Sequence, residues 1–149
     1  MKVLLQIGMM LLILVPCCIM DLKTKTLPVI WLWVYTLIGV VVSAFGKEEW
    51  TSIFLGFIPG FLLFFISFVT NGGIGRGDAY LYLAIGSIIG VRDTLIVLFL
   101  SLLLAAGYGV YLLKVQKKQR NYKIPFAPFT AGGYGIFLLI FFGTQLVGT

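Results

Sequence analysis

Long apolar runs constrain the fold of this chain more than any other feature. The chain has 149 residues, of which 60% are hydrophobic and 11% charged, and its mean hydropathy is +1.09. This composition lies outside the range of soluble globular domains. A run of about 20 apolar residues can span a bilayer as a helix, because a helix satisfies its own backbone hydrogen bonds. The chain is therefore expected to be an all-α integral membrane protein.

Six apolar segments account for nearly the whole chain and predict a six-helix transmembrane bundle. They are residues 2–20, 27–45, 50–69, 79–91, 94–113 and 126–147. The fourth has only 13 residues and contains Gly86 and Gly90, so a short or tilted crossing and a re-entrant element both fit its length. The segments leave no room for a separate soluble domain. Residues 1–149 are interpreted as a single domain.

The lysines and arginines orient these segments. Connections rich in these residues lie in the cytoplasm according to the positive-inside rule. With the N-terminus outside, the inner connections carry eight of them, and the outer side carries three. The inner ones are Lys23, Lys25, Arg76, Lys114, Lys117, Lys118, Arg120 and Lys123, and the outer ones are Lys2, Lys47 and Arg92. We therefore expect both termini outside and a full crossing by residues 79–91.

Composition also excludes several classes of function. The chain has no histidine, so Ser-His and Cys-His nucleophiles and histidine metal sites are ruled out. It has no phosphate-binding loop of the GxxxxGK[ST] type. Most of the net charge of +6 lies in one connection, Lys114 to Lys123, beside predicted spans. Such a loop contacts anionic lipid headgroups, so membrane lipids are expected partners and nucleic acid is not.

The N-terminal segment has features of a secretory or lipoprotein signal. Lys2 precedes an apolar run that ends at Cys17 and Cys18. Pro16 and the five apolar segments that follow favour a retained first span instead. The two cysteines are adjacent and lack the spacing of a zinc site, so we expect them to be small buried hydrophobic residues.

Two aspartates stand beside predicted span ends on the same side of the membrane. Asp21 lies in the run from Met20 to Pro28, and Asp78 follows a glycine-rich run, Gly72 to Gly77. Taken singly, Asp21 fits a helix end paired with a lysine, and Asp78 fits a helix N-cap. Carboxylates are costly at membrane depth, however, and each aspartate is the other's candidate partner. Their joint occurrence indicates an acid/base pair.

The glycines and the carboxylates together suggest a peptide-cleaving site. Gly75 and Gly77 carry no side chain, so an extended peptide could approach Asp78 closely. Two close carboxylates share one proton, and the ionised one can take a proton from water while the other polarises a carbonyl. The alternative is a small transporter or proton-coupled channel. Such a protein usually places carboxylates near the midplane and shows repeat symmetry, and neither feature is evident in the sequence.

Three motifs resemble those of the type IV prepilin peptidases, which are membrane aspartyl proteases of the GxGD type. Gly75-Arg76-Gly77-Asp78 is similar to the GxGD signature, and Asp21 to Pro28 resembles the family's first catalytic motif. Pro125-Phe126-Ala127-Pro128-Phe129 is similar to the late Pro-Phe-Gly-Pro-Phe segment. The resemblance implies that Asp21 and Asp78 are the catalytic pair, supported by Gly75, Gly77 and Pro28.

The resemblance also implies a reaction and a location. Family members remove the short leader from prepilin-like or pseudopilin substrates at the cytoplasmic face of the bacterial membrane. Two departures are Val29, where the family usually has asparagine, and Tyr80, where it often has lysine. Long members carry a cysteine-rich cytoplasmic insertion and methylate their product. This chain shows neither that insertion nor a CxxC motif, so it resembles the short form, and we expect no zinc and no S-adenosylmethionine.

Overall fold

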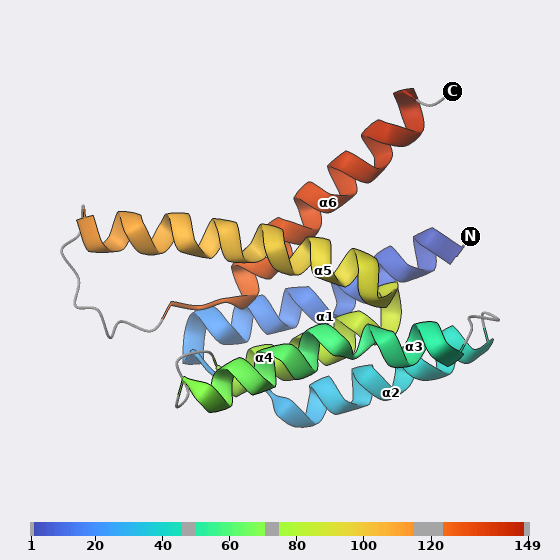
Figure 1. The fold of residues 1–149 in the computed structure, drawn as a ribbon, viewed down its shortest axis with the longest axis horizontal. Coiled ribbons are helices and arrows are strands. Elements are labelled where there is room, and N and C mark those ends of the chain that lie inside the picture. Colours follow the sequence, from blue (N-terminus) through green and yellow to red (C-terminus); the bar gives the residue numbers. More distant parts are fainter. Residues whose placement is uncertain (1, 46–49, 71–74, 115–123, 148–149) are drawn as a thin grey trace.

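The computed structural model describes residues 2–45, 50–70, 75–114 and 124–147, and all the regular secondary structure in these ranges is helical. Figure 1 shows the arrangement of these helices. The all-α prediction is confirmed. The helices are α1 (Lys2–Thr24), α2 (Val29–Phe45), α3 (Trp50–Gly56), α4 (Ile58–Val69), α5 (Arg76–Lys114) and α6 (Ala127–Val147).

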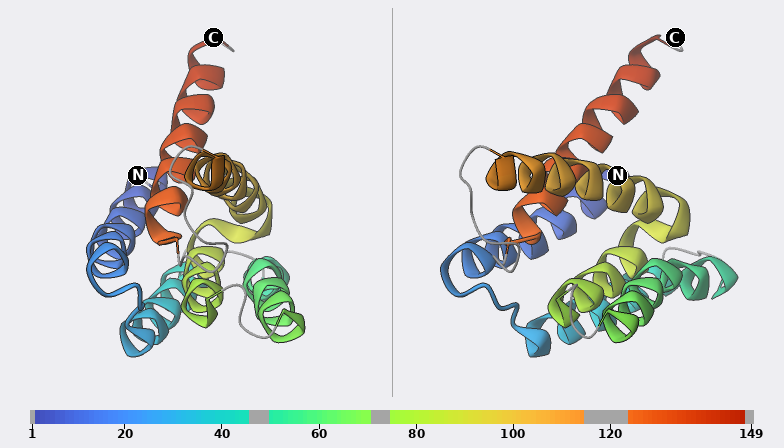
Figure 2. Two further views of the ribbon diagram at one scale, coloured as in Figure 1. Left: turned by 90° about the vertical axis from the view of Figure 1, so that its left-hand side faces the viewer. Right: turned by 60° about the vertical axis from the view of Figure 1, so that its left-hand side comes forward.

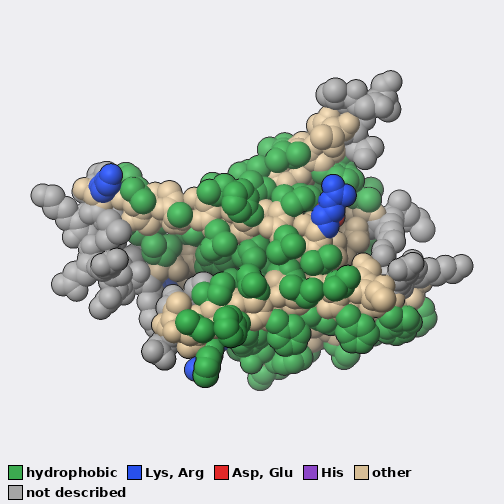
Figure 3. All heavy atoms as spheres, viewed as in Figure 1, with side chains coloured by type: hydrophobic (Ala, Val, Ile, Leu, Met, Phe, Trp, Pro, Cys, Tyr) green, Lys and Arg blue, Asp and Glu red, His purple; other side chains and the backbone are tan. Residues whose placement is uncertain are grey.

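Among the described residues, four helical stretches have the length and apolar composition to cross a membrane. They are Val3–Thr24, Trp50–Val69, Arg76–Leu112 and Ala127–Thr144, and the apolar helix α2 is slightly shorter, with 17 residues. Large apolar side chains point away from the bundle, and Figure 3 shows them covering one face of it. Ile30, Phe45 and Phe68, for example, are at least 80% exposed. An apolar exterior of this kind suits lipid contact, so the chain forms a multi-pass membrane protein.

Helices α3 and α4 together form one stretch that is interrupted by a proline. Phe57 separates the two helices with helical dihedral angles (φ −78°, ψ −15°). Pro59 lies in the first turn of α4, where its missing N–H is tolerated. The stretch therefore keeps one direction, as the predicted segment 50–69 requires.

Helix α5 doubles back on itself at Gly90, which has φ 79° and ψ 174°. In an unbroken helix, Tyr82 and Leu98 would lie about 24 Å apart along the axis. Instead, both belong to one buried cluster with Leu63 and Ala79. Figures 1 and 2 show the chain reversing its direction within α5, so that the second half runs back along the bundle. The predicted division between segments 79–91 and 94–113 is thus real, but the turn is at Gly90, inside the fourth segment rather than after it.

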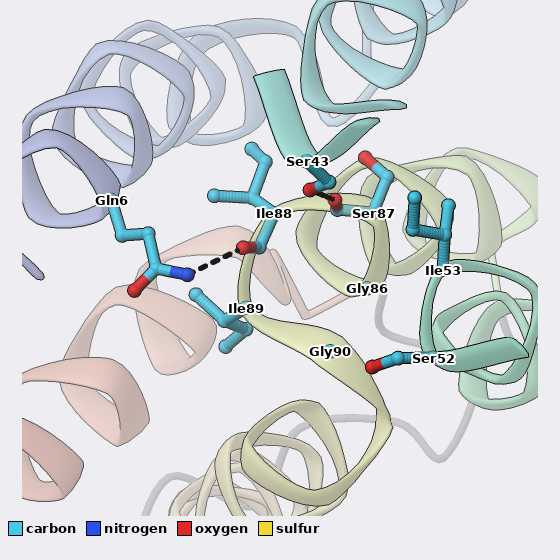
Figure 4. Close-up of a pocket in the computed structure, with 9 residues that line it drawn as sticks. All are labelled: Gln6, Ser43, Ser52, Ile53, Gly86, Ser87, Ile88, Ile89 and Gly90. Atoms are coloured by element: carbon cyan, nitrogen blue, oxygen red, sulfur yellow. Dashed lines mark hydrogen bonds between the residues drawn. The ribbon is translucent and has the colours of Figure 1, made fainter. Parts of the chain in front are cut away.

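Polar side chains satisfy the backbone carbonyls that the break at Gly90 leaves without helical partners. Gln6 Nε2 donates a hydrogen bond to Ile88 O (3.0 Å), and Ser43 Oγ donates one to Ser87 O (2.8 Å). A cavity of about 50 Å³ lies beside them, and Ser52 also lines it (Figure 4). Gly90 is twelve residues beyond Asp78, so this cavity lies about 18 Å along the helix from that carboxylate.

The first half of α5 is the centre of the bundle, and every residue from 81 to 88 is buried. Glycines on three surrounding elements allow their backbones to approach it. A side chain at Gly39 of α2 would meet Ser87, one at Gly56 of α3 would meet Gly86, and one at Gly60 of α4 would meet Leu83. Small residues serve this purpose at helix interfaces in membranes. The short helix is therefore held by close packing on several sides.

Among the described residues, helix α6 packs against the bundle through its first half. Its N-terminal residue Ala127 and Tyr134 belong to the main core cluster, together with Ile13 and Cys17 of α1 and Val97 of α5. Leu139, by contrast, is 76% exposed, and Figures 1 and 2 show the later turns of α6 leaving the bundle. The start of α6 is therefore fixed against α1 and α5.

Candidate active site

Asp21 lies in the last turns of α1, and only 6% of its surface is exposed. Its carboxylate Oδ2 accepts a hydrogen bond from the backbone N–H of Ala127 (2.9 Å). Ala127 is the first residue of α6, and the N–H groups of a first helical turn have no partner within the helix. A carboxylate is a favourable partner there because the helix N-terminus carries partial positive charge. The sequence placed Asp21 correctly at a helix end, but gave no sign of this partner.

The chain leaves α1 through a residue in the left-handed conformation and returns towards α5. Lys25 has φ 52°, and its N–H donates to Asp21 O (2.9 Å), which closes the helix. Leu27 then packs against Gly77, where a β-carbon would lie 2.9 Å from Leu27 Cβ. Pro28 O accepts the N–H of Leu32 in the first turns of α2 (3.2 Å). The first motif thus contacts the second one directly, through Leu27.

Asp78 lies in the first turn of α5 and is partly buried. Its backbone N–H donates to Gly75 O (3.0 Å). A β-carbon on Gly75 would lie 2.8 Å from Asp78 Oδ2, so glycine at this position leaves room for the carboxylate. Gly75 and Gly77 therefore have separate uses: the first makes space for the acid, and the second admits Leu27. Gly72, Gly73 and Ile74 lie outside the described residues.

The structure brings the two predicted site residues together. Asp21 and Asp78 are close enough for their negative charges to repel each other. They come from helices α1 and α5, and their positions are 57 residues apart in the sequence. The two aspartates thus lie near each other, and their action as an acid/base pair stays a prediction.

The Pro125–Phe129 segment lies between the two aspartates. The ring of Phe126 lies 6.2 Å from that of Tyr82 and packs against the cluster that contains Ala79, the residue after Asp78. On its other side, Ala127 binds Asp21, and Cys18 Sγ donates to Ala127 O (3.3 Å). All three motifs therefore meet at one end of the bundle. Cys17 is buried as expected, whereas Cys18 is partly buried and takes part in this contact.

Two departures from the family pattern have local structural explanations. Val29 is the first residue of α2, and 36% of its surface is exposed. The ring of Tyr80 lies 4.7 Å from that of Phe64, edge to face, and 5.8 Å from that of Trp33. An aromatic residue at position 80 therefore packs α5 against α2 and α4.

Other predicted features can be placed only in part. Within the described ranges, no three Cys, Asp or Glu side chains gather closely enough to hold a metal ion. Of the basic connection Lys114–Lys123, only Lys114 belongs to the described residues. Lys47, Glu48 and Glu49 also lie outside them.

The fold and the site define a class of multi-pass membrane protein with a carboxylate pair at one end of a helical bundle. Residues 8–110 match the model of the type IV leader peptidase family, a stretch that contains both aspartates. The chain belongs to this family, and the resemblance to prepilin peptidases is confirmed.

One curated relative is the prepilin leader peptidase/N-methyltransferase of Bacillus subtilis (strain 168). It is 32% identical to this chain over 108 residues, which cover 68% of this chain and 44% of the relative. The chain thus matches less than half the length of this relative. No solved structure matches the chain.

Proposed function

We propose that this protein is an aspartic endopeptidase that removes the leader peptide from prepilin-like or pseudopilin substrates. The observation that carries the proposal is the meeting of Asp21 and Asp78, each within its own motif, at one end of a membrane bundle. Membership of the type IV leader peptidase family supports it. The relative from Bacillus subtilis, named as a prepilin leader peptidase, gives the substrate class.

The proposed reaction uses the two carboxylates in opposite protonation states. The ionised one takes a proton from a water molecule as the water oxygen attacks the scissile carbonyl carbon. The protonated one donates to the carbonyl oxygen, so the developing negative charge is stabilised. When the tetrahedral intermediate collapses, the carbon–nitrogen bond breaks and the leaving nitrogen receives a proton. Asp21 and Asp78 perform both steps, and Gly75 and Gly77 leave the second motif open to an extended peptide.

The proposed topology has six crossings, with the aspartates at the cytoplasmic face. The two halves of α5 count as separate crossings because the chain reverses at Gly90. Both chain ends lie at one end of the bundle in Figure 1, which supports a common outer side for the termini. Lys23, Lys25 and Arg76 lie within the two aspartate motifs, and basic residues favour the cytoplasm. The enzyme would thus form a single domain in the bacterial cytoplasmic membrane, with membrane lipids around it.

Co-expression with a prepilin-like substrate tests the proposal. A gel shift and N-terminal sequencing of the product would show whether the leader is removed and at which bond. We expect cleavage by the wild type and none by Asp21→Asn or Asp78→Asn, although both variants accumulate in the membrane. Retained cleavage in either variant would overturn the assignment. Proton or ion flux through vesicles that is lost in Asp78→Asn would support a transporter instead.

A further inference from the structure

The first turn of α6 connects the surroundings of the two aspartates. At its start, the Ala127 N–H binds the carboxylate of Asp21. Thr130, three residues further on, faces Tyr82, which lies one helical turn beyond Asp78 on α5. Ala127, Thr130 and Tyr82 have no exposed surface. The contact between the two sides is therefore fully enclosed by protein.

A continuous set of hydrogen bonds runs through this turn. The Tyr82 hydroxyl donates to Thr130 Oγ1 (3.4 Å), and the Thr130 hydroxyl donates to Phe126 O (3.4 Å). That carbonyl belongs to the same peptide unit as the Ala127 N–H, which donates to Asp21. Hydrogen bonds in such a chain polarise one another. A single peptide plane thus links the hydroxyls beside Asp78 to the carboxylate of Asp21.

Close packing keeps this turn in place. A β-carbon at Gly133 would lie 3.0 Å from Ser101 N, so α6 approaches the second half of α5 closely. On the opposite side, Cys18 Sγ donates a hydrogen bond to the carbonyl of Ala127. The turn cannot move without disturbing contacts to α1 and to both halves of α5.

We propose that residues 127–130 form a positioning turn that sets the separation and orientation of Asp21 and Asp78. Ala127 acts on Asp21 through its backbone N–H, and Thr130 with Tyr82 holds the turn against the helix of Asp78. These are positioning residues and do not touch the substrate. The proposal rests on the proposed peptidase function and assigns a role to the Pro125–Phe129 segment.

Substitutions at the two ends of the positioning turn test its effect on catalysis. Ala127→Pro removes the N–H at a helix position that accepts proline, whereas Ala127→Gly keeps the N–H. Because misplacement by 1 Å can cost about 100-fold, we expect Ala127→Pro to lower kcat by about 100-fold with an unchanged KM. Thr130→Val should lower kcat by about 10-fold, a smaller loss because its hydrogen bonds are long.

Conservative variants separate positioning from a general loss of structure. Ala127→Gly keeps the backbone N–H, and Thr130→Ser keeps the hydroxyl. Each should therefore retain most of the kcat that Ala127→Pro or Thr130→Val, respectively, loses. The proposal is overturned if Ala127→Pro or Thr130→Val keeps the wild-type kcat while thermal melting shows that the variant is folded. It is also overturned if the losses appear in KM alone. If Ala127→Pro fails to fold, the comparison of Thr130→Val with Thr130→Ser tests the proposal.

A second readout does not depend on activity. Phe126-Ala127 is the only Phe-Ala pair in the sequence, so ¹³C-carbonyl phenylalanine with ¹⁵N-alanine labels one amide. We expect its proton resonance to move upfield in Asp21→Ala and to stay in place in Lys23→Gln, which changes an exposed residue on the same helix end. An unmoved resonance in Asp21→Ala would overturn the positioning turn. Failure of the wild type to cleave prepilin-like substrates would instead overturn the proposed function, and this signal would still test the contact.

Discussion

At each end of the first half of α5, a helix ends inside the bundle and leaves backbone groups without a partner in that helix. The two ends supply hydrogen-bond partners for these groups in different ways. Just before Gly90, the carbonyls of Ser87 and Ile88 accept hydrogen bonds from the side chains of Ser43 and Gln6 instead of from the backbone of the helix. Near Asp78, the unpaired N–H of Ala127 is bound by a carboxylate. Uncharged side chains are enough to complete a helix end in a membrane. A pair of carboxylates exceeds that need, which fits the proposal that the first end closes the fold and the second contains the active site.

The largest effect is expected at the carboxylates, because they are the proposed acid and base of the reaction. Asp21→Asn and Asp78→Asn should each lower the cleavage rate by about 10²–10⁴-fold, the usual contribution of acid/base groups. The double variant should be no slower than the slower single one, because residues that act as a unit are not additive. Single-turnover rates with purified enzyme would check this. Multiplying losses would mean that the two aspartates act independently.

The contact between the two catalytic motifs should give the next largest effect. Gly77→Ala places a methyl group against Leu27, and we expect a loss of activity of about 100-fold from displacement of the first motif. Leu27→Gly removes the contacting Cβ, so the double variant should recover activity, whereas Leu27→Ala should not restore it. Gly135→Ala is the matched control, since nothing lies within 4 Å of that position. Equal activity of Gly77→Ala and the control would refute the contact.

At the opposite end, substitution of Gly90 should change stability rather than catalysis. Its dihedral angles suit glycine only, so Gly90→Ala should lower the free energy of unfolding in detergent by about 1–3 kcal/mol. Gly107→Ala, in a regular and open part of the same helix, should instead raise it by about 0.5–1 kcal/mol. The rate per folded molecule should remain that of the wild type in both. A Gly90→Ala enzyme as stable as the wild type would contradict the reversal at this residue.

The smallest effects are expected from the side chains that cap this break. Gln6→Ala and Ser43→Ala each remove one hydrogen bond to a carbonyl, and such bonds average about 0.6 kcal/mol in membrane proteins. Unfolding experiments in mixed micelles would detect the combined loss in the double variant. A loss of catalytic rate instead would show that this end also serves the chemistry.

The sequence predicts much of the fold because hydropathy reports directly on membrane spans. The all-α fold is confirmed, Gly86 and Gly90 correctly marked the fourth segment as unusual, and the count of six crossings stays a prediction. The exact turn at Gly90 was missed because Arg92 and Asp93 suggested a loop, whereas both continue the helix. The break near Pro59 was also missed. Residues 50–69 are apolar almost throughout, so their hydropathy gives no sign that a new helix begins with Pro59 in its first turn.

The candidate site was predicted less completely. Its aspartates and glycines belong to motifs, so their residue types carry the signal. The role of the Ala127 N–H could not be predicted in this way, because every residue except proline has a backbone N–H. Tyr82 and Thr130 were missed for a related reason, because each is a lone polar residue within an apolar helix. Their spacing from Asp78 and Pro128 gains meaning only when α5 and α6 are packed together.

Comparison of Asp21→Asn with Gln6→Ala tests the central claim most directly. Each variant weakens a bond between a side chain of α1 and the backbone of another helix, at opposite ends of the bundle. Cleavage of a prepilin-like substrate, measured under single-turnover conditions with N-terminal sequencing of the product, should be lost in Asp21→Asn and unchanged in Gln6→Ala. Cleavage by Asp21→Asn at the wild-type rate, or an equal loss in both variants, would contradict the account.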